Sequence, residues 1–204
     1  EQKIGIMREK LNIFGKPGKV WFIRLFILFL LFARPLNIYW IGNNLGSGIQ
    51  WALFHYQQTI YGNQAFTLIQ DLGYVFSGII TGRSAYSLLL WSSGALVMFV
   101  ILVYLIFTWL EGKPDDKPLI GISVIISGLL FMLSLIAHYG PTLNGPAGFC
   151  IPVGIPVVWI IGYIMYSQSK EYDQENRGEK EQIEEEELAE DGKNEIDDGY
   201  SDLL

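Results

Sequence analysis

The sequence has very few of the residues that build catalytic and metal sites. Among its 204 residues there are one cysteine, Cys150, and two histidines, His55 and His138. A single cysteine forms no intramolecular disulfide, and no Cys/His cluster has the spacing of a zinc site. The neighbours of Cys150 are apolar and include no base, so a nucleophilic role is disfavoured. The sequence therefore predicts no catalytic residue, no metal site and no cofactor.

Charged residues are also scarce over most of the chain. The 14 Lys and Arg and 21 Asp and Glu give a net charge of −7. Residues 1–169 hold ten basic and six acidic residues (+4), whereas residues 170–204 hold four and fifteen (−11). No basic segment interleaved with aromatic residues is present, so nucleic-acid binding is not expected. The glycine-rich stretch 42–48 lacks a following Lys-Ser or Lys-Thr pair and predicts no nucleotide site.

Long apolar stretches are what the chain does have. A helix needs about 20 residues to cross about 30 Å of hydrocarbon, and four stretches reach this length: 21–41, 88–110, 118–138 and 147–167. The second and third contain no charged residue. We therefore expect an all-α integral membrane protein with a four-helix transmembrane bundle. The competing interpretation is a water-soluble protein in which these segments are core helices.

Basic residues predict the orientation of such a protein, because cytoplasmic flanks are enriched in Lys and Arg. In a four-span topology the segment before the first span, the connection between the second and third spans and the segment after the fourth span lie on one side of the membrane. They carry Lys3, Arg8, Lys10, Lys16, Lys19, Arg24 (in the first turn of the first span), Lys113, Lys117 and Lys170. The opposite side offers only Arg83. We expect a cell-membrane location with both termini in the cytoplasm. Residues 1–169 then form the transmembrane domain, and the acidic tail 170–204 is predicted to be disordered and available to a basic partner.

The outer segment 43–87 is too long and too apolar for a plain connection. Apolar residues recur at helical spacing in two parts of it, around 49–60 and 66–76, so we expect two amphipathic helices. A fifth membrane span over 64–82 is the competing assignment. Asp71 near its middle opposes that assignment, because a buried acid is costly in a bilayer.

Arg34 is the most informative single residue of the first span. Its side chain leans toward the bilayer centre if the helix continues past it, and Asp71 is the only acidic residue assigned to the outer side. We therefore predict an Arg34–Asp71 ion pair. The alternative is that Pro35 stops the helix near Ala33, which leaves Arg34 at the outer interface in contact with headgroup phosphates.

Two weaker patterns remain. His55 and His138 both fall on the outer side, where they form a candidate polar site with Asp71. Small residues also recur along the third span and predict a helix-packing face, for self-association or for neighbouring helices; they are Gly121, Ser123, Ser127, Gly128 and Ser134.

These features favour a non-enzymatic subunit of a membrane complex that contacts the lipid bilayer and other membrane subunits or copies of itself. The first alternative is a small oligomeric channel or transporter with Arg34 and Asp71 on its path. The second alternative is a membrane enzyme at the outer interface that uses His55, His138, Asp71 and Arg34. The spans lack the several polar midplane residues of a transporter site, and the outer residues form no known catalytic motif.

Overall fold

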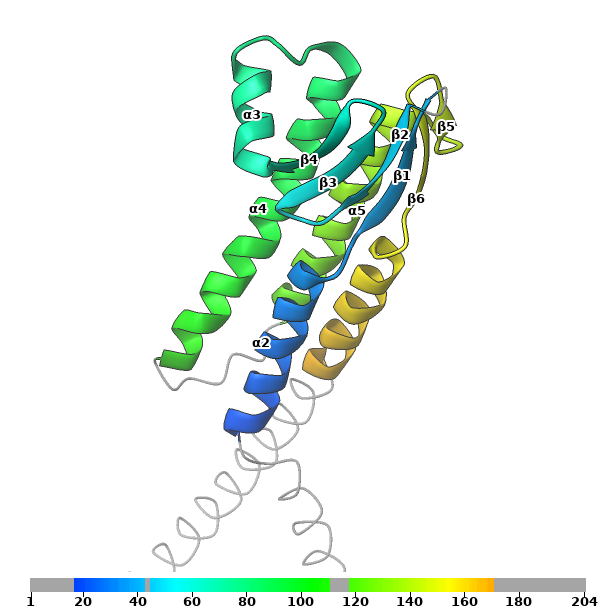
Figure 1. Ribbon diagram of the computed structural model, residues 1–204. Helices are drawn as coiled ribbons and strands as arrows, with labels where there is room; N and C mark the ends of the chain where they lie inside the picture. Colours follow the sequence, from blue (N-terminus) through cyan, green and yellow to red (C-terminus); the bar gives the residue numbers. More distant parts are fainter. Residues whose placement is uncertain (1–16, 43–44, 111–117, 171–204) are drawn as a thin grey trace, which may run out of the picture.

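A computed structural model of the protein describes residues 17–42, 45–110 and 118–170. Long helices run side by side, and a β-sheet with one short helix lies at one end of them (Figure 1). The long helices are α2 (Pro17–Ala33), α4 (Gly82–Leu110), α5 (Leu119–Tyr139) and a helix over residues 155–170. The short helix is α3 (Leu68–Phe76). Of the predicted acidic tail 170–204, residues 171–204 lie outside the described residues.

The sheet has six antiparallel strands in the order β4-β3-β2-β1-β6-β5. Their bounds are β1 Asn37–Ile41, β2 Gly46–Gln50, β3 Phe54–Thr59, β4 Gly62–Thr67, β5 Asn144–Gly145 and β6 Gly148–Ile151. Four strands follow one another between α2 and α3, and the other two come from the connection after α5. The pairing of β1 with β6 joins these two parts of the chain into one sheet.

The prediction of an all-α four-helix transmembrane bundle is wrong, because one end of the molecule is a six-stranded sheet. Two helical segments, Gly82–Thr108 and Leu119–Tyr139, are long and apolar enough to cross a membrane. Helix α2 has 17 residues, and the last helix has residues 155–170 described; both are shorter than those two segments. The structure therefore supports membrane association through two helices.

The predicted helical outer segment is also largely wrong. The first predicted helix, around 49–60, corresponds to the hairpin of β2 and β3, and α3 coincides with most of the second. A fifth span over 64–82 is not formed, because β4 and the nine-residue α3 occupy this range. The segment is rich in aromatic residues and Thr, which favour strands. The spacing of its apolar residues was therefore compatible with strands as well as with helices.

Local chemistry explains where the first strands begin. Helix α2 ends at Ala33, as expected from Pro35, since proline disfavours helical geometry at the residue before it. The sequence NIYWI of β1 then supplies β-branched and aromatic residues. In β2, Gly48 is paired with Tyr39, and a β-carbon at Gly48 would collide with the Tyr39 ring. The glycine thus provides the space in which this ring packs across the sheet.

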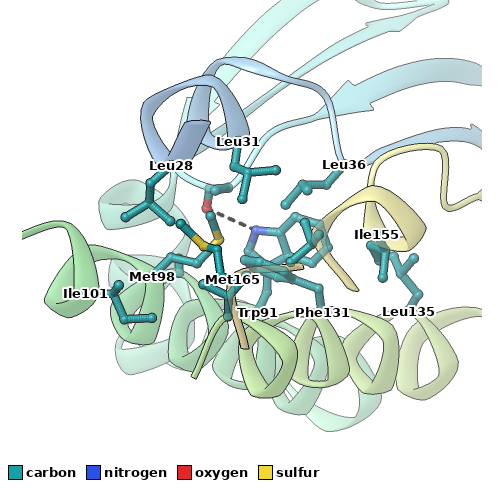
Figure 2. Close-up of a cluster of buried hydrophobic side chains, with 14 of the residues drawn as sticks. Leu28, Leu31, Leu36, Trp91, Met98, Ile101, Phe131, Leu135, Ile155 and Met165 are labelled. Carbon is teal, nitrogen blue, oxygen red and sulfur yellow. Dashed lines mark hydrogen bonds between the residues drawn. The ribbon is translucent and has the colours of Figure 1, made fainter. Parts of the chain in front are cut away.

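Two tryptophans attach the sheet to the helices at the β2–β3 turn. Trp51 Nε1 donates to the Ala33 carbonyl oxygen at 3.0 Å, and Trp91 Nε1 donates to the Ala52 carbonyl oxygen at 3.1 Å. The Trp91 ring is buried against Phe131 of α5, with ring centroids 4.6 Å apart. Figure 2 shows this ring within the apolar core, where side chains from α2, α4, α5 and the last helix meet. The core therefore continues from the helices to the base of the sheet.

Candidate functional site

The sheet together with α3, named the outer part, contains a buried ionisable contact at Asp71. This residue lies in the first turn of α3, where a carboxylate is favoured by the helix dipole. A capping box between Thr67 and Gln70 fixes the start of that helix. Asp71 is only 6% exposed, and its Oδ2 lies 3.2 Å from His55 Nδ1. The resulting His55–Asp71 pair joins strand β3 to helix α3.

Aromatic rings enclose the imidazole of this pair. His55 is opposite Phe66 in the β3–β4 ladder, and the two rings stack with centroids 5.1 Å apart. Tyr39 of β1 approaches His55 edge-on at 6.4 Å. Burial, and secondarily the negative charge of Asp71, raises the pKa of Tyr39 well above its ordinary value. Tyr39 thus stays a neutral phenol near neutral pH, and the enclosed pair is arranged to hold two elements together.

Arg34 lies apart from this pair. It follows the last residue of α2, its side chain is exposed, and its backbone N–H donates to the Leu30 carbonyl oxygen at 3.0 Å. Within the described chain Asp71 has His55 as its ionic partner, so the predicted Arg34–Asp71 pair is not formed. The reason is the helix end at Ala33, which leaves Arg34 in the connection between α2 and β1.

His138 lies in the last turn of α5 and is half-buried. Its nearest aromatic neighbour is Tyr139, with ring centroids 4.6 Å apart. The described residues contain no group of three or more His, Cys, Asp and Glu side chains that could hold a metal ion. The structure therefore brings His55 together with Asp71 and places His138 in the helical part.

Two of the predicted packing serines contact α4. Ser127 Oγ donates to the Gly94 carbonyl oxygen at 2.8 Å, and Ser134 Oγ donates to the Ser87 carbonyl oxygen at 2.7 Å. The hydroxyls of Ser87 and Ser134 also lie 2.9 Å apart. All these contacts are buried. The serine spacing of seven residues therefore marks the face of α5 that packs against α4.

The two predicted packing glycines contact the other neighbour of α5. A β-carbon at Gly121 would collide with the backbone at Tyr166 and lie 2.7 Å from the Gly162 carbonyl oxygen. A β-carbon at Gly128 would lie 2.5 Å from Trp159 Nε1. Ser123, also predicted on this face, is half-buried. Helix α5 thus lies between α4, which its serines contact, and the helix over 155–170, which its glycines approach.

Cys150 lies in β6 opposite Tyr39 and is 5% exposed. Burial raises the pKa of its thiol from 9.0 to about 11. A thiol with so high a pKa holds very little thiolate at neutral pH, so Cys150 is suited to packing rather than to nucleophilic chemistry.

Sequence reasoning missed Ser87, which provides one end of the α4–α5 contact, and Tyr39, which contacts His55. Ser87 and Gly94 are seven residues apart, as are Ser127 and Ser134. This shared spacing is the sequence signal that could have identified Ser87. Tyr39 was hidden because it was assigned to a membrane span, where it has no reason to approach His55.

No family model matches the sequence, and a search of curated proteins likewise gives no match. Any assignment of function therefore depends on the chemistry and geometry of the chain itself.

Proposed function

We propose that the protein is an integral membrane protein that acts as a non-enzymatic interaction subunit. In this proposal α4 and α5 cross the membrane as an antiparallel hairpin, and the sheet with α3 lies outside it. The observation that carries the proposal is a belt of exposed large apolar side chains on the helices. Its members on the hairpin include Leu96, Phe99, Val100, Phe107, Ile122, Ile126, Leu129 and Leu133. Lipid is the solvent in which such a surface is stable.

The length of the hairpin supports this location. Helix α5 has 21 residues and an uncharged sequence, and at about 1.5 Å per residue it matches about 30 Å of hydrocarbon. The apolar belt continues onto Phe26, Phe29 and Leu30 of α2 and onto Ile160 and Ile164 of the last helix. In this proposal α2 and the last helix therefore lie beside the hairpin and also expose apolar side chains to lipid.

Basic residues support the orientation. Lys113 and Lys117 lie in the connection between α4 and α5, and cytoplasmic connections favour lysine. The first residues of α2 and the last residues of the 155–170 helix lie at the same end as the last residues of α4 (Figure 1). We therefore place this end of the helices on the cytoplasmic side and the sheet on the outer side of the cell membrane.

Exposed apolar side chains on the outer part support the interaction role. Tyr61 at the β3–β4 turn is 85% exposed, and Phe76 at the end of α3 is 79% exposed. Ile60, Ile69 and Ile79 are also exposed. A water-facing part that exposes several large apolar side chains is a candidate protein-binding surface. The partner in this proposal is another membrane subunit or a second copy of the chain, and a basic partner would engage the acidic tail.

Cysteine labelling in intact cells tests the orientation. Tyr61→Cys is expected to react with a membrane-impermeant maleimide, whereas Lys113→Cys reacts only after the membrane is permeabilised. The buried Cys150 provides little background in either variant. The opposite labelling pattern would reject the proposed orientation.

Photocrosslinking in the membrane tests the interaction role. A photoreactive phenylalanine analogue at Phe76 is expected to give a discrete protein adduct. The same analogue at Leu129, on the lipid-facing belt of α5, serves as the control and is expected to give none. A Phe76 variant without an adduct, in cells that express the folded protein, contradicts a partner at this surface.

A further inference from the structure

An open surface cavity lies where the outer ends of α4 and α5 meet. Its volume is about 300 Å³, and its lining consists of Arg83, Tyr86, Ile136, Ala137, Gly140 and Pro141. Arg83 is the only charged residue among these lining residues. The cavity thus combines one cation with an apolar wall, and it belongs to none of the polar contacts described above.

The serine contacts between α4 and α5 establish the depth of this cavity. Ser134 is level with Ser87, and Ser127 is level with Gly94, because each pair is joined by a hydrogen bond. The two contacts are seven residues apart on both helices, which run antiparallel. Four residues beyond Ser87 in the outward direction is Arg83, and four residues beyond Ser134 is His138. Arg83 is therefore level with the last turn of α5, at the outer end of its 21-residue span.

This depth corresponds to the headgroup layer if α5 crosses the hydrocarbon, as the proposed function requires. Tyr86 is exposed beside Arg83, and tyrosine is enriched at this level of membrane proteins because its ring is apolar and its hydroxyl is polar. Leu89 and Leu133, one turn deeper on the same two helices, are exposed to the proposed lipid. The polar groups of Arg83 and Tyr86 thus lie at the level of a phospholipid headgroup, and the apolar Leu89 and Leu133 lie at the level of its acyl chains.

We infer that this cavity binds the phosphate of a phospholipid through Arg83, with its acyl chains along Leu89 and Leu133. A guanidinium presents N–H donors in a planar fork that matches phosphate oxygens. The apolar wall of Ile136 and Ala137 accepts the glycerol end of the acyl chains. The inference rests on the proposed membrane location and adds a ligand class to it.

Binding to the full-length protein in mild detergent tests the inference. The probes are dioctanoyl phosphatidylglycerol, dioctanoylglycerol without phosphate, and inorganic phosphate, each titrated by calorimetry. The phosphatidyl lipid is expected to bind more tightly than either fragment. Equal affinity for dioctanoylglycerol overturns the role of the phosphate, and equal affinity for inorganic phosphate overturns the assignment to a lipid.

Arg83→Gln is expected to raise the dissociation constant of the phosphatidyl lipid about tenfold or more, because a charge-assisted hydrogen bond is lost. Arg83→Lys should have a smaller effect, since it keeps the charge and loses the fork. Lys170→Gln is the control, because it removes an exposed positive charge at the far end of the last helix, away from the cavity. An equal loss for Lys170→Gln and Arg83→Gln overturns the site.

A second variant keeps the test independent of charge. Ala137→Phe fills the cavity and is expected to weaken lipid binding while Arg83 remains in place. Unchanged binding in this variant overturns the inference. Alkaline carbonate extraction separates failure of the site from failure of the proposed function: extraction of the wild-type protein contradicts the membrane location, whereas resistance to extraction with unaltered binding in Arg83→Gln contradicts the site alone.

Discussion

The helical part and the outer part of the protein bury polar groups of different kinds. Between α4 and α5 the buried polar contacts are neutral, from serine hydroxyls to the carbonyl oxygens of Ser87 and Gly94. In the outer part Asn37 Nδ2 donates to Gln50 Oε1 as a neutral contact, but the contact without a counterpart among the described helices is between the ionisable side chains of His55 and Asp71. The apolar belt surrounds the serine contacts, and the sheet with α3 encloses the ionisable pair.

This difference follows the solvents that we propose for the two parts. A charged group in a bilayer is costly, whereas a hydroxyl bound to a backbone carbonyl oxygen satisfies its donor at little cost. A carboxylate near water is tolerated when a partner and a helix terminus stabilise it. We therefore expect mutations in the outer pair to cost more stability than mutations of the serine contacts.

The largest expected effect is at Asp71. Asp71→Ala leaves His55 without its partner inside the outer part and is expected to lower the free energy of unfolding by about 3 kcal/mol. Asp71→Asn keeps an oxygen acceptor for His55 and is expected to cost about 1 kcal/mol. Thermal unfolding in detergent measures both values. A loss of about 1 kcal/mol or less for Asp71→Ala would show that the pair does not hold α3 to β3.

The next effect tests close packing on the glycine face of α5. Gly121→Ala places a methyl group against the backbone of the last helix and is expected to cost about 1–3 kcal/mol. Gly73→Ala is the matched control, since no neighbouring atom lies within 4 Å of its added methyl group. Alanine favours helix over glycine, so the control should keep or raise the unfolding temperature. Similar losses in both variants contradict the close approach of the two helices.

A smaller effect is expected from the serine contacts. Ser134→Ala removes the hydroxyl between α5 and α4 and is expected to cost about 0.6 kcal/mol, the average for such contacts in membrane proteins. Ser93→Ala is the control, because the Ser93 hydroxyl donates to the Leu89 carbonyl oxygen of its own helix and is exposed. A cost for Ser134→Ala above that of Asp71→Ala would reverse the comparison between the two parts.

The last prediction concerns the reactivity of Cys150 and not the stability of the fold. A thiol with a pKa of about 11 instead of 9.0 holds about a hundredfold less thiolate at pH 8. Alkylation by iodoacetamide is therefore expected to be about a hundredfold slower in the folded protein than in the unfolded chain, and to accelerate as the pH rises toward 11. The alkylation rate with and without denaturant is the measurement. Equal rates at pH 8 would show that the outer sheet leaves Cys150 accessible.

Sequence reasoning located the helical part well and the outer part poorly. The two uncharged stretches 88–110 and 118–138 coincide with most of α4 and with α5, since a long apolar run allows few other structures. Trp40 and Trp91 lie near the ends of the predicted spans 21–41 and 88–110, and in the structure both make packing contacts. Trp40 stacks on Phe149 across β1 and β6 at 4.4 Å, and Trp91 is buried in the core.

The strands escaped prediction because their partners are distant in the sequence. Strand β6 lies in a stretch that was assigned to a membrane helix, and only its pairing with β1 makes it a strand. The partner of Asp71 was also difficult to predict, because it too is distant in the sequence. Arg34 and His55 can both carry a positive charge, so both were possible partners of Asp71. In the structure α2 ends before Arg34, and β3 brings His55 next to Asp71.

The β1–β6 ladder also has a consequence for the order in which the protein assembles. Residues 38–41 pair with residues 148–151, so roughly 100 residues must be synthesised after β1 before its second edge is covered. At about 5–20 residues per second, this edge stays open for at least about 5 s during translation. An open strand edge is a site of unwanted pairing. The nascent outer part is therefore most exposed to misassembly in that interval, before the last helix is made.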